Sequence, residues 1–386
     1  MNYMKMGFIH KNYGYNRLIS FMNYDLGAIV KNFKIEGEYK SAEPYGSGHI
    51  NDTYLITTSY IRYLLQRVNH HVFKNVPQLM HNIELVTNHI KNVLTGREGA
   101  DIVSRACLTF FPTKRGKLYH RDDWGNYWRL TVFIENSHTY DIVASPEQAY
   151  AGGKAFGRFQ TMLSDFNADL LHESIPFFHN VQKRLQTFAA SLKKDPLGRA
   201  QIIHAEIDVV EARSEEMQCI LRLAEQGKIP LRVTHNDTKF NNILFNQDDK
   251  VICVIDLDTV MPGYVHYDFG DAIRTCTNTG AEDEQDLNKV SMDITLYEGF
   301  ATGFLDETKT FLTVTEIDYL AFSAKLLTFI MGLRFLTDYI DGDIYYKIHH
   351  PDHNLNRARA QFRLLASMDA QYQEMREIVK NITKNK

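Results

Sequence analysis

The stretch Leu231–Met261 (LRVTHNDTKFNNILFNQDDKVICVIDLDTVM) gathers the residues of this sequence that are best suited to chemistry. Within it, the short runs Asn242–Phe245 and Val251–Ile255 flank the polar turn Asn246–Lys250. Two strand-forming runs separated by a polar turn predict a β-hairpin. We therefore expect the polar residues before the first strand to lie beside those that follow the second strand.

Five side chains would meet at this end of the hairpin: His235, Asp237 and Asn242 from one side, and Asp256 and Asp258 from the other. Carboxylates that converge repel one another unless a cation lies between them. Carboxylate and carboxamide oxygens are hard ligands of the kind that Mg²⁺ prefers. The sequence thus predicts a magnesium site formed by Asn242 and Asp256, with Asp258 as an additional candidate ligand.

The spacing of these residues narrows the chemistry. His235-x-Asp237 followed by Asn242 matches HxDxxxxN, the catalytic-loop pattern of protein kinases. In that pattern the Asp accepts the proton of the attacking hydroxyl, and the Asn and a later Asp hold magnesium. HxD followed by Asn also occurs by chance, and hairpin ends often expose acids for solubility. The catalytic interpretation, with Asp237 as base, is favoured because the hairpin comes with all four residues of the pattern, His235, Asp237, Asn242 and Asp256.

A second acidic motif follows closely. Asp268-Phe269-Gly270 spells DFG, the metal-binding motif of protein kinases, but it comes after a Pro262-Gly263 turn rather than after the hairpin. Asp256 therefore has the better predicted position for a metal. We interpret Asp268 and Asp271 as parts of a structural network that bonds the backbone of the catalytic loop.

These motifs resemble those of the aminoglycoside phosphotransferase/choline kinase superfamily, and most closely those of the bacterial N-acetylhexosamine 1-kinases. The resemblance extends from about Met22 to near the end of the chain. It is carried by Gly46-Ser47-Gly48-His49-Ile50-Asn51 with Thr53-Tyr54, Val233–Phe245, Ile255–Gly263, Asp268–Arg274, Gly332–Tyr346 and Asp352–Arg359.

The resemblance implies ATP- and Mg²⁺-dependent phosphorylation of a small-molecule sugar, at the anomeric C1 hydroxyl of GlcNAc or GalNAc. Asp237 would orient and deprotonate that hydroxyl. Two alternatives stay open. The acceptor could be a choline-like amino alcohol or an aminoglycoside, for which Asp338, Asp341 and Asp343 could form an acidic pocket. The chain could also be a non-catalytic binding protein with a kinase fold, because the usual phosphate-binding lysine is missing.

For the nucleotide, the resemblance places Gly46, Ser47 and Gly48 in the loop over the phosphates, where glycine lets backbone amides approach an anion. Gln66 occupies the expected position of the lysine, and Arg67 beside it is the candidate replacement if a bulge turns it inward.

Three further residues complete the predicted nucleotide half. Glu84, on the following helix, is either the ion-pair partner of the phosphate-binding cation or simply a solvent-facing residue. Adenine would bond the backbone near Phe133–Glu135, where the lobes join.

On the acceptor side, Arg334 interrupts an apolar helix, and a buried arginine requires partners. It either pairs with Asp338 at i+4 or donates hydrogen bonds to the sugar. The resemblance favours the second interpretation and adds His49 and Tyr345 as sugar contacts.

The pattern of elements predicts a small α+β lobe followed by a larger, mostly helical one, and the resemblance implies an α+β, protein-kinase-like two-lobed fold. Residues 1–134 would form a small β-rich lobe around one helix at Val76–Leu94, with strands near Ala106–Pro112 and Asn126–Phe133. Residues 135–386 would form a larger, mainly helical lobe. Its longest expected helices are Pro146–Leu163, Glu206–Gln226 and Glu316–Tyr339.

Composition excludes several other classes. The 386 residues carry a formal net charge of −4, so no global positive field exists to hold nucleic acid. The most apolar stretch, Ala321–Leu336, contains Lys325 and Arg334 and falls short of the roughly 18 apolar residues that span a membrane. The N-terminus lacks an apolar signal core, and patterned sequence begins just after Met22. Four cysteines without a CxxC pair fit a reducing compartment, so we expect a cytoplasmic protein.

Overall fold

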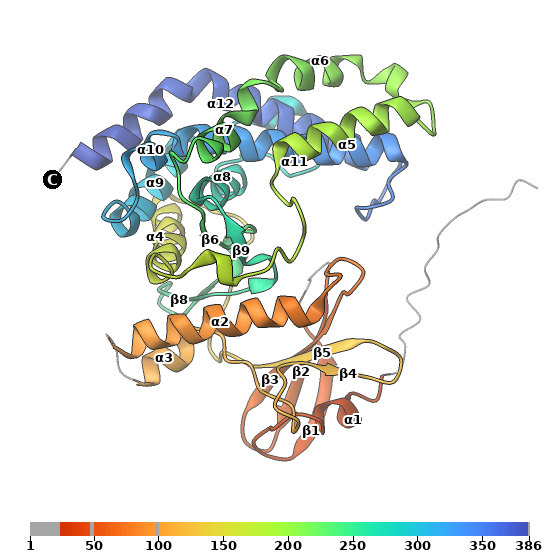
Figure 1. The fold of residues 1–386 in the computed structure, drawn as a ribbon, viewed down its shortest axis with the longest axis vertical. Helices are drawn as coiled ribbons and strands as arrows, with labels where there is room; N and C mark the ends of the chain where they lie inside the picture. The colour runs from red at the N-terminus through yellow and green to blue at the C-terminus, as the bar shows by residue number, and fades with distance from the viewer. Residues whose placement is uncertain (1–23, 47–49, 97–99, 385–386) are drawn as a thin grey trace, which may run out of the picture.

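A computed structural model describes residues 24–46, 50–96 and 100–384 of the chain. It has the predicted protein-kinase-like two-lobed fold, with an antiparallel sheet in the N-terminal part and helices in the C-terminal part (Figure 1). The strands are β1 (Tyr39–Pro44), β2 (Asp52–Thr58), β3 (Arg62–Val68), β4 (His120–Arg121), β5 (Tyr127–Val132), β6 (Arg232–Thr234), β7 (Ile243–Phe245), β8 (Val251–Val254) and β9 (Met261–Gly263). The α-helices are α1 (Leu26–Val30), α2 (Val76–Thr95), α3 (Ala100–Ala106), α4 (Pro146–Met162), α5 (Val181–Lys194), α6 (His204–Arg213), α7 (Cys219–Glu225), α8 (Val265–Cys276), α9 (Ile294–Thr308), α10 (Val314–Asp318), α11 (Leu320–Asp341) and α12 (His353–Lys384).

The five-stranded sheet has the order β1-β2-β3-β5-β4 and separates two kinds of surface. Alternate residues of a strand point to opposite faces. On β3, Tyr63 and Leu65 are fully buried in a cluster that includes Trp128 of β5 and is closed by α1. Gln66 has the opposite orientation and lies directly across from Arg129 of β5. The face with Gln66 and Arg129 is therefore the one turned away from the α1 core.

Helix α2 joins the two lobes and lies between the sheet and the C-terminal helices (Figure 1). Its apolar residues share a buried cluster with Val233, Leu257 and Val260 of the C-terminal lobe. Asn82, fully buried on the same helix, donates to the carbonyl oxygens of His172 at 2.7 Å and Val260 at 3.0 Å. These contacts fix the N-terminal lobe against the strands that carry the polar residues predicted to do chemistry.

The C-terminal lobe is built on closely packed helices. Helices α4 and α9 approach until a Cβ on Gly303 would lie 2.1 Å from the carbonyl oxygen of Tyr150, so only glycine fits there. Helix α11 is long and apolar enough to cross a membrane by length and composition. However, 89% of its most apolar window is buried inside the protein, where it packs against α8 and α12. It serves as the central core helix of this lobe.

Three predicted elements differ in detail. The segment expected to be one helix at Glu206–Gln226 is divided into α6, a 3-10 turn and α7, and the one at Glu316–Tyr339 is divided into α10 and α11. The segment Ala106–Pro112, expected to be a strand, runs beside β5 without forming a regular strand. Helix α3 reaches Ala106, and only Phe110 forms a bridge, with Thr131. The hairpin of β7 and β8 forms as predicted, with Ile243 opposite Val254.

Candidate active site

The catalytic-loop sequence follows strand β6 and turns sharply at Asn236, whose φ of 65° lies in the left-handed region. His235 is completely buried, and its Nε2 lies 2.9 Å from the carbonyl oxygen of Ile255. Its Nδ1 accepts a hydrogen bond from the backbone N–H of Asp237 at 3.3 Å. These two bonds require the imidazole proton on Nε2. His235 therefore ties the loop to the end of strand β8 and supports the backbone of Asp237 rather than facing a substrate.

Two buried carboxylates of helix α8 hold the backbone of this loop. Asp268 accepts hydrogen bonds from the N–H groups of His235 at 2.9 Å and Asn236 at 2.7 Å, and from Nε2 of Gln160 at 2.6 Å. Asp271 accepts from the N–H of Thr238 at 3.0 Å. The prediction that Asp268 and Asp271 bond the loop backbone is confirmed, and the DFG spelling has a structural role here.

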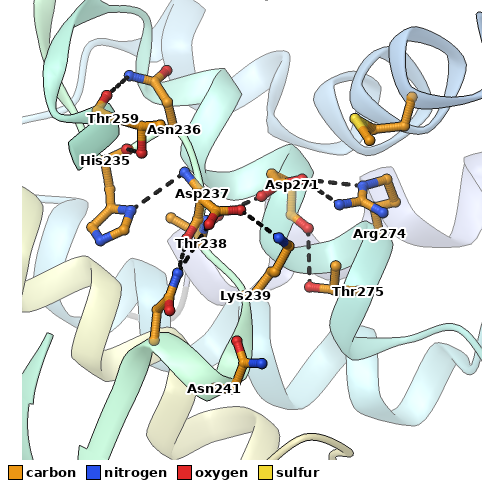
Figure 2. A network of polar contacts seen from close by, with 12 residues as sticks. His235, Asn236, Asp237, Thr238, Lys239, Asn241, Thr259, Asp271, Arg274 and Thr275 are labelled. Carbon is orange, nitrogen blue, oxygen red and sulfur yellow. Dashed lines mark hydrogen bonds and ion pairs between the residues drawn. The ribbon is translucent and has the colours of Figure 1, made fainter. Parts of the chain in front are cut away.

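Asp237 lies at the centre of a charged cluster, which Figure 2 shows together with Asp271 and Arg274. The ammonium of Lys239 lies 3.0 Å from its Oδ1. Nδ2 of Asn242 donates to its carbonyl oxygen at 2.8 Å and to Oδ2 at 3.2 Å. Burial raises the pKa of Asp237, but the charge of Lys239, its hydrogen bond and the charge of Arg274 outweigh it, so its pKa lies below the ordinary value. Asp237 is consequently ionised at neutral pH.

Asp256 differs from the other acids of this cluster. It follows strand β8 in a left-handed conformation with φ of 59°, and its side chain remains open to solvent. Within the described part of the chain, no side chain or backbone group hydrogen-bonds to its carboxylate. Loss of hydration next to the protein, together with the charges of the Asp258 and Asp237 carboxylates, raises the pKa of Asp256 to about 6. At neutral pH, Asp256 thus carries a negative charge with no ion-pair partner among the described residues.

The donor set at Asp256 and Asn242 fits Mg²⁺. The amide of Asn242 uses its nitrogen on Asp237, which leaves the carbonyl oxygen for a cation. Among residues 24–46, 50–96 and 100–384, no group of three His, Cys, Asp or Glu side chains could hold a metal ion. Mg²⁺ in phosphate-transferring sites typically takes one or two carboxylates and completes its shell with substrate phosphates and water. Asn242 and Asp256 are the predicted ligands that have free oxygens for this purpose.

The position of Asp258 does not support its predicted role as a metal ligand. Its side chain is buried, and its Oδ1 forms an ion pair with Nη1 of Arg129. Its Oδ2 accepts a hydrogen bond from Nδ2 of Asn51 at 2.7 Å. Because both oxygens are engaged, Asp258 anchors side chains of the N-terminal lobe and offers no free oxygen to a cation.

Arg67 does not replace the missing lysine in this arrangement. Successive strand residues face opposite ways, and no bulge interrupts β3 at this point, since Asp52 pairs with Arg67 and Thr53 with Gln66. The guanidinium of Arg67 forms an ion pair with Asp52 and lies over the ring of Tyr24. Arg67 is therefore on the α1 side of the sheet, away from Asp237 and Asp256.

Glu84 is exposed on α2, and no described residue forms an ion pair with it, so the solvent-facing alternative holds. Gly46 has a φ of 75° and follows β1, which suits the predicted loop. Ser47, Gly48 and His49 lie outside the described residues, and their predicted roles stay predictions.

The linker between the lobes carries the two predicted adenine contacts. Glu135 pairs with Arg62 through its side chain, and its carbonyl oxygen accepts from Nη2 of Arg105 at 2.8 Å. The N–H of Phe133 donates to the carbonyl oxygen of Arg62 at 3.0 Å. A cavity of about 320 Å³ adjoins the linker and is lined in part by Phe133, Ile134 and Glu135. These bonds fix the linker against the sheet and leave few of its backbone groups for a ligand.

Arg334 does not pair with Asp338, which excludes the simple structural explanation for this arginine. Asp338 instead accepts hydrogen bonds from the N–H groups of Tyr345 at 2.8 Å and Tyr346 at 2.9 Å. The guanidinium of Arg334 lies 5.0 Å from the ring centroid of Phe178 and within 5.9 Å of those of Tyr345 and Tyr346. None of the described acids forms an ion pair with it. Arg334 and Tyr345, both predicted sugar contacts, thus lie together.

The sequence analysis missed the other residues that surround Arg334. Arg184 donates to the carbonyl oxygen of Phe178 at 2.8 Å, and burial followed by the charge of Arg334 lowers its pKa to about 10. His179 binds the carbonyl oxygen of Asn236 through Nε2 at 3.0 Å, while its buried Nδ1 has no partner. The hydroxyl of Tyr346 is likewise buried without a partner. Arg184 and His179 reach helix α11 only in the folded chain, so no local sequence signal predicted them.

Comparison with known proteins agrees with this geometry. A family model described as the phosphotransferase enzyme family (APH) matches residues 41–299, more than half of the chain. The chain therefore belongs to this family.

Solved structures with the same fold have low sequence identity to the chain. An aminoglycoside phosphotransferase from Alicyclobacillus acidocaldarius subsp. acidocaldarius DSM 446 is 14% identical with a TM-score of 0.59, covering 92% of this chain and 96% of that one. Plasmodium vivax ethanolamine kinase is 14% identical with a TM-score of 0.52, covering 83% and 82%. A spectinomycin phosphotransferase solved with ADP and spectinomycin is 13% identical with a TM-score of 0.50, covering 90% and 98%.

Asp268→Ala should chiefly lower stability. It leaves two backbone N–H groups and the amide of Gln160 buried without an acceptor, which should cost about 3 kcal/mol or more of unfolding free energy. Asp256→Ala is the matched control, because it removes an acid without a partner and should not lower stability at neutral pH, while weakening Mg²⁺-dependent nucleotide binding. Chemical denaturation and calorimetry measure both effects. The opposite pattern would place the metal at the DFG motif.

Asp256→Asn should change how stability depends on pH. The folded pKa of about 6 exceeds the ordinary value of 3.8, so the folded state binds the proton more tightly than the unfolded state. Stability of the wild type relative to Asp256→Asn should therefore fall as pH rises from 3.8 to about 6 and stay constant above. Melting temperatures in metal-free buffer measure this difference. A wild type that gains stability over the variant in this window would contradict the assignment.

Proposed function

We propose that the protein is an ATP- and Mg²⁺-dependent kinase that phosphorylates the anomeric C1 hydroxyl of an N-acetylhexosamine. Membership of the phosphotransferase family supports phosphoryl transfer to a small molecule. The observation that carries the choice of acceptor is Arg334, which lies among aromatic rings without an acidic partner in the described chain. One of its donors reaches only the weak acceptor Sδ of Met331, at 3.2 Å, and a neutral, hydroxyl-rich substrate would supply oxygen acceptors for the others.

The charge of this region argues against a cationic acceptor such as choline or an aminoglycoside. Two guanidinium groups, Arg334 and Arg184, interact closely enough that each disfavours more positive charge nearby. The acids that could have formed an acidic pocket are engaged elsewhere. Asp338 binds backbone amides, Asp341 accepts from Ser191 at 2.9 Å, and Asp343 pairs with Arg199 at 2.6 Å.

The region around Arg334 also contains uncharged groups that suit a sugar. Nδ1 of His179 carries no proton when Nε2 donates to Asn236, and burial lowers the pKa of His179 to about 4, so this nitrogen is a buried acceptor for a hydroxyl proton. Aromatic rings such as Tyr345 provide flat apolar surfaces for the carbon faces of a sugar. His179 also bonds the backbone directly before Asp237, which connects the acceptor region to the proposed base.

In the proposed mechanism, Asp237 accepts a hydrogen bond from the C1 hydroxyl and aims its oxygen at the γ-phosphorus of ATP. An anomeric hydroxyl is more acidic than an ordinary alcohol, so the low pKa of Asp237 is compatible with this role. Positioning and neutralisation of charge then supply most of the rate increase, as expected for phosphoryl transfer. Asn242 and Asp256 would hold the magnesium ion, which neutralises the phosphates when bound.

Lys239 adds a cation that the sequence analysis did not single out. Its ammonium lies 3.0 Å from Asp237 and is itself partly exposed, so it remains accessible to a phosphate. Asp237 raises the pKa of Lys239, which keeps this group protonated at all relevant pH values. We propose that Lys239 holds Asp237 in the ionised, oriented state and lies beside the phosphoryl group during transfer.

An acceptor panel tests the function directly. Release of ADP from Mg²⁺·ATP would be measured with GlcNAc, GalNAc, glucose, choline, ethanolamine and an aminoglycoside. We expect turnover with an N-acetylhexosamine and loss of turnover when its C1 hydroxyl is blocked as a methyl glycoside. Turnover with choline but not with any sugar would select the amino-alcohol alternative. No turnover with any acceptor, despite tight ATP binding, would favour the non-catalytic alternative.

Asp237→Asn should lower kcat about 10²–10⁴-fold, the usual contribution of a positioned general base. The Kd for Mg²⁺·ATP should stay within about threefold, because Asp237 acts on the acceptor and its loss reduces repulsion at Asp256. Steady-state kinetics and calorimetry on the same preparation separate the two effects. A kcat within a few-fold of wild type would remove Asp237 as the base.

Arg334→Leu should lower kcat/KM for the sugar about ten- to hundredfold, since a charged hydrogen bond is worth roughly 1.5–3 kcal/mol. Most of the loss should appear in KM, with part in kcat through misalignment of the hydroxyl. The melting temperature should change little, because Asp338 does not depend on Arg334.

The matched control is Arg213→Leu, which removes a partly buried arginine paired with Asp369. It should leave the sugar KM unchanged. An Arg334→Leu protein that is destabilised but has normal sugar kinetics would show that this arginine is structural.

A further inference from the structure

We propose that Arg129 is the cation that binds the ATP phosphates, and that it replaces the lysine missing from strand β3. This inference rests on the proposed kinase function and answers where the phosphate-binding charge is located. Gln66 stands at the expected lysine position, and Arg129 lies directly across from it on strand β5. The two side chains share the sheet face turned away from the α1 core, and Nε of Arg129 donates to Oε1 of Gln66 at 2.9 Å.

The guanidinium of Arg129 reaches across to the loop that carries the metal ligand. It forms an ion pair with Asp258, two residues after Asp256, although the two partners are 129 residues apart in sequence. Both side chains are almost completely buried. Arg129 also acts on Asp256 itself, since its charge opposes the rise in the pKa of that carboxyl. Arg129 is thus located between the sheet and the proposed magnesium ligand, where the phosphates of a bound nucleotide would lie.

Arg129 has unused hydrogen-bonding capacity in this position. A guanidinium has five N–H donors in a fixed planar fork. Nε is used on Gln66, and one N–H of Nη1 is used on Asp258. The remaining donors have no hydrogen-bond partner among the described residues. A planar fork with free donors is well suited to phosphate oxygens.

This arrangement rebuilds a pairing that protein kinases form from other positions. In those enzymes a lysine of the third strand pairs with a glutamate of the following helix and with phosphates. Here the helix residue Glu84 is exposed and unpaired among the described residues, and the strand residue is the neutral Gln66. The cation has moved one strand across to Arg129, and its acidic partner is Asp258 in the metal loop. Gln66 and Asn51 orient the pair by hydrogen bonds to its two members.

The alternative is that Arg129 only joins the lobes by pairing with Asp258. Nucleotides with different numbers of phosphates distinguish the two roles. Calorimetry would give the Kd of Mg²⁺·ATP, Mg²⁺·ADP and AMP for the wild type and Arg129→Gln. We expect Arg129→Gln to raise the Kd of ATP and ADP about ten- to hundredfold and that of AMP less than threefold. An equal rise for all three, or no rise, would overturn the inference.

Two further variants keep the test decisive. Arg67→Gln removes the neighbouring arginine on the opposite face and should leave the ratio of the ATP and AMP Kd values unchanged. The double variant Gln66→Lys with Arg129→Gln returns a cation to the position usual in kinases, and it should recover at least tenfold of the lost preference for ATP. If Arg129→Gln alone does not fold, Arg129→Lys is measured in its place. We expect the preference of Arg129→Lys for ATP over AMP to be weaker than that of the wild type.

The outcomes for the two proposals are distinct. A wild type that binds no ATP, or binds ATP no better than AMP, would overturn the proposed kinase function. A wild type that prefers ATP, together with an Arg129→Gln protein that retains this preference, would overturn only the assignment of Arg129.

Discussion

The buried carboxylate of Asp268 is the constraint on which the candidate active site depends. It accepts hydrogen bonds from two consecutive backbone amides, at His235 and Asn236, and so fixes the left-handed turn that orients Asp237. Burial raises the pKa of Asp268, while the same hydrogen bonds lower it, so its ionised form is favoured only where these donors are present. The position of the proposed base is therefore coupled to the packing of helix α8 in the core.

Charge balance around that turn identifies the place of the cation. Asp237 has Lys239, Asp258 has Arg129, and Asp271 has Arg274, each at ion-pair distance. Asp268 is held by backbone N–H groups and Gln160, and only Asp256, among the acids of this cluster in the described chain, has neither an ion pair nor a hydrogen bond to its carboxylate. A protein that neutralises three neighbouring acids with its own side chains leaves the fourth for an external charge. The proposed role of Asp256 as a magnesium ligand follows from this difference more directly than from its motif.

Local spacing was sufficient to predict the hairpin, helix α2 and the HxDxxxxN loop, because each depends on neighbouring residues or on one strand. The role of Asp268 was also predicted, although it binds backbone groups 33 and 32 residues away. The errors involve contacts between distant segments. Arg67 was the nearest cation in sequence, but strand alternation turns it to the α1 side, and Arg129 lies 63 residues from its partner Gln66. For Arg334, i+4 spacing offered a pair with Asp338 as one of two interpretations, and this pair is absent because the folded loop at Tyr345 supplies that acid with backbone donors. Sequence periodicity cannot rank such competing partners.

The competition for Asp338 also explains why Arg334 is available to a ligand. Asp338 accepts hydrogen bonds from the backbone N–H groups of Tyr345 and Tyr346, which follow helix α11, and from Nδ2 of Asn354 at 2.9 Å. Its carboxylate is therefore engaged by these donors and does not pair with Arg334. The guanidinium then lies among aromatic faces, which attract its charge, and Nη1 donates to Sδ of Met331 at 3.2 Å. Stacking of this kind fixes the plane of an arginine, and here it leaves the N–H donors other than the one on Met331 available to a ligand. The same loop that removes the acid from Arg334 also carries the rings that orient it toward a polar acceptor.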